Sequence, residues 1–263
     1  MGRVRTMNRL FFNTLLIAAV AVIHTGLIFA QKPEAAASLP KPERLVLVGI
    51  GEPEPGVSWE KQTFITESFY PIGWSRDGKF AYFVEPPDEA CGCYFGKFVI
   101  QDLKTDKILW QDDYTGEMEV VPEENIESFW PKKQKEYAAK LKEHGIEPSS
   151  DFRLLHPSID HDGDVLTPRI DVRIKGDGVF EVEGAVRLNM DSKRSGTKVI
   201  MRDIYKKDEI NTIRNAEVAG SLLSPFEPRA AVIVVQEMRG YEGPPHITTI
   251  KVVGSTLKTG FKN

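Results

Sequence analysis

The most informative stretch of the sequence is Gly73-Trp74-Ser75-Arg76-Asp77-Gly78-Lys79-Phe80-Ala81-Tyr82-Phe83-Val84. Asp77-Gly78 is a hairpin turn signal, because glycine adopts the left-handed φ of such a turn at little cost. The run from Phe80 to Val84 contains no polar break, which predicts a strand buried on both faces. We therefore expect a β-hairpin whose second strand lies inside a layered body.

Further short strands surround this hairpin. Phe95 to Leu103 and Lys107 to Trp110 are the next predicted strands along the chain. Upstream, Arg44 to Ile50 and Trp59 to Thr66 read as two earlier strands. The strands between Tyr70 and Tyr114 are expected to form one antiparallel meander.

The clearest helix signal runs from Pro131 to His144. Proline suits the first helical position, where its missing N–H is not needed. Gly145 follows as a helix stop, and Ile146 is then placed to contact Leu141 across it. The apolar stripe of this helix is narrow, so we expect the helix to lie on the outside of a sheet.

The second half of the chain changes to alternating polar and apolar residues. Between positions 170 and 188, charged residues alternate with the apolar residues Ile170, Val172, Ile174, Val186 and Leu188. Such period-two alternation indicates strands with one wet face. By contrast, the run from Ala230 to Val235 is entirely apolar and predicts a central strand, followed by a last strand from Ile247 to Val253.

These elements predict a β-rich α+β body of antiparallel meanders, in an incomplete propeller-like or sandwich arrangement, with one external helix. We expect residues 43–263 to form a single domain. Its two ends look alike, since a serine-led turn feeds an apolar strand at Ser75 and again at Ser224. This similarity predicts a diverged repeat covering about 70–114 and 219–257, and the alternative is two unrelated hairpins with the same turn chemistry.

Residues 1–30 read as a secretory signal peptide. Three arginines precede an apolar run from Leu10 to Ala30, after which Ala30-Gln31 is a candidate cleavage point. The run is also long enough to cross a bilayer, so an uncleaved N-terminal anchor is the alternative. In both cases the body would be periplasmic or secreted, and a Pro- and Ala-rich linker at 31–42 would precede it.

The charge of the chain limits its partners. The full sequence carries a net charge of −4, and loss of the three leader arginines would make it about −7. A negative body argues against nucleic acid and against anionic membrane surfaces, so a membrane is expected only if the N-terminal segment is uncleaved. The sequence points to no cofactor, and the expected partner is an envelope protein or a glycan.

The Gly73–Lys79 motif resembles the blade motif of the Tol-type periplasmic β-propellers, in which a Trp-Ser-Pro-Asp-Gly-Lys turn precedes an apolar strand. Arg76 stands here in place of the proline. A broader resemblance is to an uncharacterised family of predicted secreted bacterial proteins. It includes the export signal, the helix ending at His144-Gly145-Ile146, and the segment Gly240-Tyr241-Glu242-Gly243-Pro244 before the last strand. The resemblance implies an exported protein and assigns no catalytic residue.

Cys91 and Cys93 are the only cysteines of the chain, and Gly92 separates them. In an oxidising compartment they are a disulfide candidate, although a bridge across a single residue is strained. Two plain thiols, a link to another molecule, and a metal or redox role are the alternatives. A structural zinc site would need two further ligands from distant residues.

The densest polar cluster is Asp160-His161-Asp162-Gly163-Asp164, with His156 nearby. Clustered carboxylates suit calcium, so Asp160, Asp162 and Asp164 are metal candidates, but the glycine position and the missing glutamate do not fit an EF-hand loop. An envelope hydrolase that uses His156 with these carboxylates is a further alternative. The simplest interpretation is a solvated turn before a strand.

Two other features are candidates for binding. Core packing or a sugar-binding platform would account for the four tryptophans, Trp59, Trp74, Trp110 and Trp130. A binding rim in the loop before the last strand would consist of Arg239, Tyr241 and Glu242. We therefore predict a non-enzymatic periplasmic or secreted binding or interaction module. An envelope hydrolase or a metal-binding protein based on the His156 and Asp160–Asp164 cluster is the alternative.

Overall fold

The computed structural model describes residues 38–47, 64–88, 92–116, 124–176, 182–206, 212–240 and 245–262. They belong to one compact unit, Ala37–Asn263. The predicted signal peptide at 1–30 and most of the predicted linker lie outside the described residues, as do Cys91, Tyr241 and Glu242. Within the described ranges, no helix is long and apolar enough to span a membrane.

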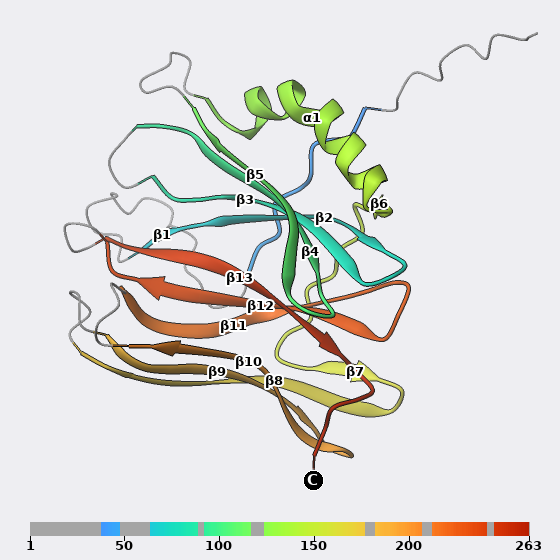
Figure 1. Cartoon of the computed structure of the whole chain (residues 1–263), viewed down its shortest axis with the longest axis vertical. Coiled ribbons are helices and arrows are strands. Elements are labelled where there is room, and N and C mark those ends of the chain that lie inside the picture. The colour runs from blue at the N-terminus through green and yellow to red at the C-terminus, as the bar shows by residue number, and fades with distance from the viewer. Residues whose placement is uncertain are drawn as a thin grey trace, which may run out of the picture. The chain divides into compact units, whose positions relative to one another are not determined.

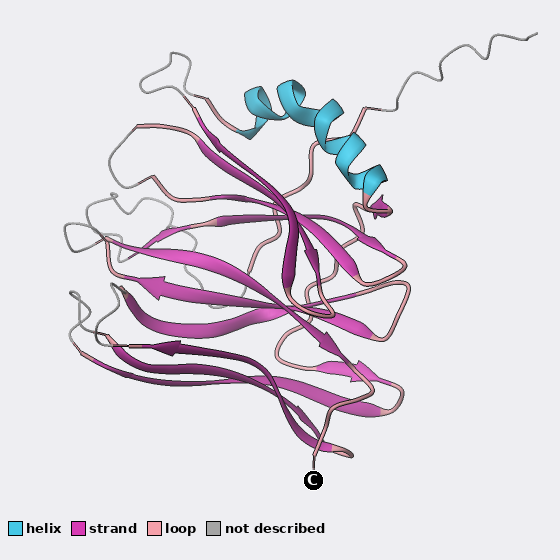
Figure 2. Cartoon of the chain, in the orientation of Figure 1, coloured by secondary structure: helices cyan, strands magenta, loops and turns pink. Residues whose placement is uncertain are grey.

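The described chain is mainly antiparallel β-structure with a single helix (Figure 1, Figure 2). Its strands, in chain order, are β1 Phe64–Thr66, β2 Ser68–Ser75, β3 Lys79–Glu85, β4 Phe95–Asp102, β5 Lys107–Thr115, β6 Ile146–Pro148, β7 Ile159–His161, β8 Asp164–Lys175, β9 Glu183–Ser192, β10 Gly196–Tyr205, β11 Ile213–Leu223, β12 Arg229–Met238 and β13 His246–Thr256. The helix α1 covers Ile126–Glu143, between β5 and β6. The expected β-rich body with one helix is thus confirmed.

The strands form three sheets. The helix-side sheet has the strand order β5-β4-β3-β2-β6, the central sheet has the order β1-β13-β12-β11, and the outer sheet has the order β10-β9-β8-β7. Neighbouring strands pair antiparallel, so that each sheet is built on a meander. The exception is β1, which pairs parallel with β13. The first strand of the described chain therefore lies beside the last one.

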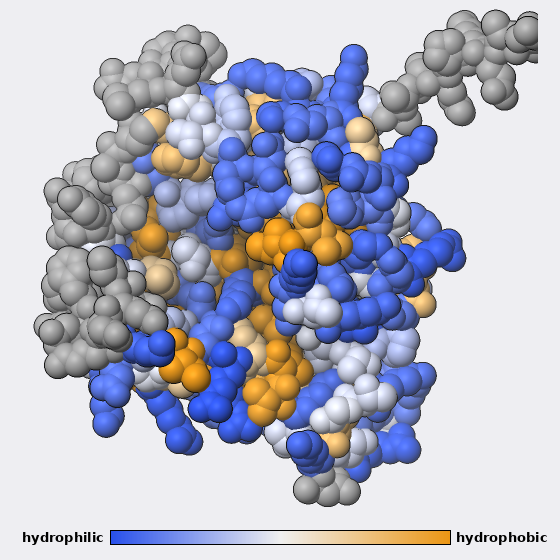
Figure 3. Space-filling view, viewed as in Figure 1, coloured by the Kyte–Doolittle hydropathy of each residue, from blue (hydrophilic) through white to orange (hydrophobic). Residues whose placement is uncertain are grey.

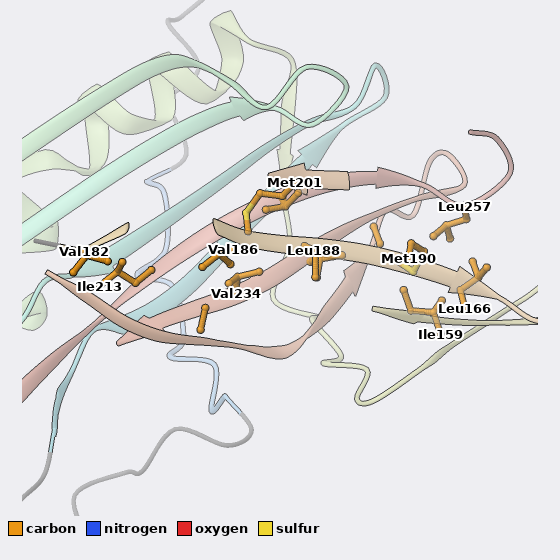
Figure 4. Packing of buried hydrophobic residues seen from close by; sticks show 14 residues of the cluster. Ile159, Leu166, Val182, Val186, Leu188, Met190, Met201, Ile213, Val234 and Leu257 are labelled. Carbon is orange, nitrogen blue, oxygen red and sulfur yellow. The ribbon is translucent and has the colours of Figure 1, made fainter. Parts of the chain in front are cut away.

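Strand β12 is buried on both faces, as the apolar run predicts. One face contributes Ala230, Val232 and Val234 to a cluster shared with the outer sheet, which we call the outer core (Figure 4). The alternate residues Ala231, Ile233 and Val235 belong to a second cluster, the middle core, which is shared with the helix-side sheet. The period of two thus sends successive side chains of one strand into two different cores.

Strand β3 repeats this arrangement one layer away. Phe80, Tyr82 and Val84 lie in the middle core, whereas Ala81 and Phe83 lie in a third cluster, the helix core, against α1. The predicted burial of Phe80–Val84 on both faces is confirmed. Among the described residues, none of the three cores combines side chains of the outer and helix-side sheets. The layers therefore follow the order outer sheet, central sheet, helix-side sheet and α1.

The helix begins earlier than its sequence signal. Asn125 is the N-cap, and its side chain accepts a hydrogen bond from the Ser128 N–H while the Ser128 side chain accepts one from the Asn125 N–H. Such reciprocal capping satisfies two backbone donors, so the helix starts at Ile126 and Pro131 lies inside it. The prediction of Pro131 as the first helical residue was wrong. The predicted stop is confirmed, because Gly145 follows the helix with φ +67°.

The predicted strand at Arg44–Ile50 is not formed by its described residues. Residues 44–47 have no strand assignment, although the Leu45 N–H donates to the Phe69 carbonyl at 2.8 Å. Leu45 and Leu47 pack against the middle core instead. Of the next predicted strand, the described part is β1, which begins at Phe64.

Candidate functional site

A cleft of about 910 Å³ lies where the ends of the three sheets come together. Its walls come from β2 and β6 of the helix-side sheet, from β11 of the central sheet, and from β7 of the outer sheet. The segment between β6 and β7 and the turn between β11 and β12 complete it. We call this site the three-sheet cleft.

Trp74 forms the buried back of the three-sheet cleft. Its side chain is 2% exposed, and its ring packs against Phe80 with 4.5 Å between the ring centroids. The indole Nε1–H finds no hydrogen-bond acceptor among the described residues. An unpaired buried donor costs roughly 1–3 kcal/mol, so structures rarely retain one without a reason.

Two further aromatic rings line the cleft. Phe152 packs edge-on against Phe80 at 6.4 Å. Phe226 lies in the β11–β12 turn, and the Arg76 guanidinium stands over its ring at 4.8 Å. Arg76 Nε in turn donates to Glu147 Oε1 at 2.9 Å. The rim of the cleft is therefore held by contacts between the helix-side and central sheets.

The turn that carries Phe226 is fixed by a largely enclosed arginine. Arg229 Nε pairs with Glu227 Oε1 at 2.6 Å, and Arg229 Nη1 donates to the Leu103 carbonyl at 2.8 Å. The Arg229 side chain is 12% exposed, so this bridge between two sheets is shielded from solvent. Hydrogen bonds from a charged donor in such surroundings hold their geometry well.

Three exposed charged side chains face the cleft without an ion pair. They are Asp151, Arg153 and Asp160, and none has an ion-pair partner within the described part of the chain. Aromatic surface and unpaired charges of both signs thus meet in one concavity. Such a combination is typical of sites for small polar ligands.

The Asp160–Asp164 cluster is a tight hairpin turn between β7 and β8. Asp162 and Gly163 have φ of +51° and +73°, and His161 pairs with Asp164 across the turn. A hydrogen bond from the Ser192 hydroxyl lowers the pKa of Asp164, and a contact with Lys258 Nζ at 3.1 Å lowers the pKa of Asp162. These carboxylates are therefore engaged within the protein.

The structure does not bring the metal candidates Asp160, Asp162 and Asp164 together. Within the described residues, no group of three or more His, Cys, Asp or Glu side chains is arranged to hold a metal ion. The reason is the turn itself, since the cross-strand partners of Asp160 and Asp164 are Val165 and His161, and Asp162 sits at the tip. Of the three, Asp160 lines the cleft.

The two histidines of the predicted hydrolase are also apart from the cleft. His156 is exposed and precedes Pro157 through a cis peptide bond. His161 Nε2 lies 3.4 Å from Asp162 Oδ2 at the tip of the hairpin. Neither histidine lines the three-sheet cleft, so the predicted pairing of His156 with the cluster carboxylates is not found there.

The remaining predicted sites are described in part. Cys93 is disulfide-bonded, and its predicted partner Cys91 lies outside the described residues. Arg239 is half-buried, and its backbone N–H donates to the Thr212 carbonyl at 2.8 Å. Because Tyr241 and Glu242 are not described, the binding rim at 239–242 stays a prediction.

The tryptophans do not form one platform. Trp130 belongs to the helix core, where its Nε1 donates to the Leu39 carbonyl at 3.1 Å, and the partly buried Trp110 packs against that core. Trp74 lies on the opposite face of the helix-side sheet, in the middle core. Trp59 is outside the described residues. The three described tryptophans therefore pack in or against two separate clusters.

A second hollow, of about 440 Å³, borders the edge of β13 beyond the residues 246–248 that pair with β1. Figure 3 shows hydrophobic side chains on the viewed face, along which β5, β13 and β10 run. Side chains form hydrogen bonds with the backbone groups of this edge. The Ile250 N–H donates to the Glu67 carboxylate, and the Gly254 N–H donates to the Asp106 carboxylate. The Val252 carbonyl accepts from the Gln101 side chain. Sealing of an exposed edge prevents pairing with a further strand, so we assign these residues to protection of the sheet.

Burial raises the pKa of Glu67 to about 7, against the opposing effect of the hydrogen bond from Ile250. Its side chain is almost fully enclosed between the central and helix-side sheets. A carboxyl in this state changes its charge near neutral pH. The edge of the central sheet therefore contains a pH-dependent contact.

Comparison with known proteins identifies no relative of this chain. The chain matches no protein-family model, and no curated protein or solved structure is significantly similar to it. The resemblances to Tol-type propeller blades and to the secreted bacterial family stay predictions. The function must therefore be argued from the site itself.

Sequence reasoning missed Phe152, Arg153 and Phe226. They lie in segments without period-two or helical pattern, and the structure brings them together from positions more than 70 residues apart. The Ser224-Pro225 turn signal located Phe226 on a turn but said nothing of what faces it. The sequence did single out Asp160, but as part of a site with Asp162, Asp164 and His156, none of which lines the cleft.

Proposed function

We propose that the protein is an exported, non-enzymatic binding module that holds its ligand in the three-sheet cleft. The observation that carries the proposal is the meeting of unpaired Asp151, Arg153 and Asp160 with the rings of Phe152 and Phe226 in one concavity. The two rings offer apolar surface, and the three charged side chains have no ion-pair partner within the described residues, so they are available to a ligand.

The expected ligand is a short glycan of the cell envelope. A sugar ring presents an apolar face to an aromatic ring and hydroxyl groups to charged side chains, and the cleft offers both kinds of wall. The buried Trp74 N–H behind the wall is a further donor without an acceptor. Export of the chain, expected from its leader, would place the cleft in the compartment where such glycans occur.

We favour binding over the histidine-based hydrolase. His156 and His161 do not line the cleft, and acid–base catalysis by a histidine needs its side chain within reach of the substrate. The cleft is wide and open between three sheets, which suits recognition of a surface-exposed group.

The layered packing favours the sandwich over the propeller-like alternative. In a closed propeller the sheets surround a channel, so the first and last sheets would also pack together. Here the far face of the helix-side sheet is covered by α1, and the outer sheet packs on the central sheet. We infer a sandwich extended by a third sheet, whose ends provide the cleft.

The proposal is tested by calorimetric titration with a panel of neutral, amino and acidic trisaccharides. We expect at least one saccharide to bind, and Asp160→Asn or Phe226→Ala to weaken its affinity about tenfold, since each removes one contact worth roughly 1.5 kcal/mol. Asp113→Asn is the matched control, because Asp113 is exposed on β5 outside the cleft. Absence of binding across the panel, or equal affinity of all variants, would contradict the proposal.

A further inference from the structure

The outer sheet has one face in the outer core and one face toward solvent. Val186 and Leu188 of β9 lie in the outer core with Val234 of β12 (Figure 4). The alternate residues of β8, β9 and β10 therefore share the opposite face, as the cross-strand register confirms for Arg187 and Arg202. We call this opposite surface the arginine face.

The arginine face is rich in unpaired basic groups. Its basic residues are Arg169, Arg173, Lys175, Arg187 and Arg202, and its acidic residues are Asp171, Glu183 and Asp191. Both oxygens of Asp171 are taken, one by Arg169 and the other by Asn189 Nδ2 at 2.9 Å. Asp191 is likewise held by Arg169 Nε at 2.9 Å.

Three arginines remain without an ion pair. Arg173, Arg187 and Arg202 are exposed, and none is paired with a carboxylate among the described residues. Arg187 and Arg202 are direct cross-strand partners. The other cross-strand neighbour of Arg187 is Asp171, whose two oxygens are held by Arg169 and Asn189. Like charges opposite one another destabilise a sheet, so the juxtaposition of Arg187 and Arg202 costs the fold stability.

Aliphatic side chains accompany these arginines. Ile204 is 57% exposed and Val199 is 47% exposed, and both lie on the arginine face of the edge strand β10. Ala185 is the cross-strand partner of both Arg173 and Ile204, so a short side chain separates two long ones. The face therefore combines guanidinium groups with a protruding apolar edge.

We propose that the arginine face docks on an anionic lipid surface. Guanidinium groups bind lipid phosphates in a forked geometry, and aliphatic side chains that project between them enter the acyl boundary. A soluble polyanion would satisfy the arginines but would leave Ile204 and Val199 in water. The exposed aliphatic pair is thus the observation that favours lipid.

The negative charge of the whole chain does not oppose this docking. Charges interact over roughly 8–10 Å at physiological ionic strength, and stacked sheets lie about 10 Å apart. The acidic residues of the helix-side sheet and α1 are two layers away from the arginine face. A membrane in contact with the outer sheet is therefore affected mainly by the local basic charge.

The test is flotation with lipid vesicles. The body Ala37–Asn263 contains all three hydrophobic cores and can be studied without the apolar leader, which would bind lipid by itself. We expect binding to vesicles with 30% phosphatidylglycerol, little binding to pure phosphatidylcholine, and loss of binding as salt is raised. Each neutralised arginine should lower the partition coefficient about fivefold, so Arg187→Gln/Arg202→Gln should lower it about 25-fold.

Two further variants separate the possible outcomes. Lys104→Gln/Lys107→Gln removes the same charge from the β4–β5 turn and the start of β5 in the helix-side sheet, and should leave vesicle binding unchanged. Ile204→Ser should weaken vesicle binding but leave any binding to dextran sulfate unchanged. The proposal is overturned if the two double variants bind vesicles equally, if Ile204→Ser has no effect, or if dextran sulfate binds while anionic vesicles do not.

Discussion

Strands β3 and β12 have the same apolar pattern, but different elements pack over their second faces. Both are buried on both faces, and both contribute to the middle core. The second face of β12 meets another sheet, whereas the second face of β3 meets the single helix α1. The difference shows that an apolar run specifies burial on two sides, while the identity of each cover depends on distant parts of the chain.

The largest expected effect concerns the helix-covered strand. Phe83 is 0% exposed in the helix core, where its ring stacks on Phe129 at 5.7 Å and meets Trp130 edge-on. Phe83→Ala should lower the free energy of unfolding by about 3–5 kcal/mol, because it leaves a cavity between β3 and α1. Urea unfolding measures this loss, and the exposed Ile108→Ala on β5 should change stability by less than about 0.5 kcal/mol.

The same experiment tests whether the layers unfold together. A single transition with an unchanged m-value is expected for Phe83→Ala, since β3 and β12 share the middle core. Two separate transitions would contradict the shared core and would make the helix side an independent unit.

The next effect concerns the edge of the central sheet, beside β12. Burial raises the pKa of Glu67 from 4.5 to about 7, so the folded state holds this proton more tightly than the unfolded state. Stability should therefore decrease as pH rises from about 4.5 to about 7, by up to about 3 kcal/mol, and remain lowered above that range. Glu67→Gln mimics the protonated form and should remove most of this decrease.

Thermal unfolding between pH 4.5 and 8.5 measures the effect. The exposed Glu43→Gln serves as the control, because Glu43 lies near the start of the described chain, away from the β13 edge. If Glu67→Gln and Glu43→Gln had the same pH profile as the unchanged protein, Glu67 would not be the buried carboxyl of the sealed edge.

A smaller effect on stability should distinguish the helix that covers β3 from the sheet that covers β12. Asn125 caps α1, so Asn125→Ala should cost about 1 kcal/mol and loosen the cover of β3 alone. Hydrogen exchange should become faster in α1 while β12 keeps its protection. Asn125→Asp retains a capping oxygen and should restore protection of the helix. Equal losses in α1 and β12 would show that the two covers are not separable.

The smallest effect is expected on the arginine face. Arg187→Gln/Arg202→Gln removes two like charges that face each other across β9 and β10, so stability should stay within about 0.5 kcal/mol or rise slightly. Urea unfolding checks this expectation. A loss of 2 kcal/mol or more would mean that these arginines support the fold, and their role in docking would lose its basis.

The fold could be predicted from the sequence as far as local pattern reaches. Apolar runs at 80–84 and 230–235 predicted strands buried on both faces, and alternation at Ile170, Val172 and Ile174 predicted a sheet with one wet face. Pairing of β1 with β13 joins residues about 180 positions apart, and no local period contains that information. The start of α1 was missed because the proline signal outweighed the capping pair of Asn125 and Ser128.

The site was less predictable than the fold. Asp160 stood out in the sequence because acids cluster around it, but the hairpin turn disperses those acids. Phe152 and Phe226 lie in irregular segments, and the ends of three different sheets place them together. A site assembled from sheet ends depends on tertiary packing, so sequence patterns identify its residues only by chance.

Hydrogen exchange of the unchanged protein tests the layered arrangement most directly. If the central sheet lies between two others, the amides of β12, residues 229–238, should exchange most slowly and should open only with global unfolding. The edge strands β5 and β10 should exchange faster through local opening. Exchange of β12 as fast as that of β5 or β10 would contradict a strand enclosed on both faces.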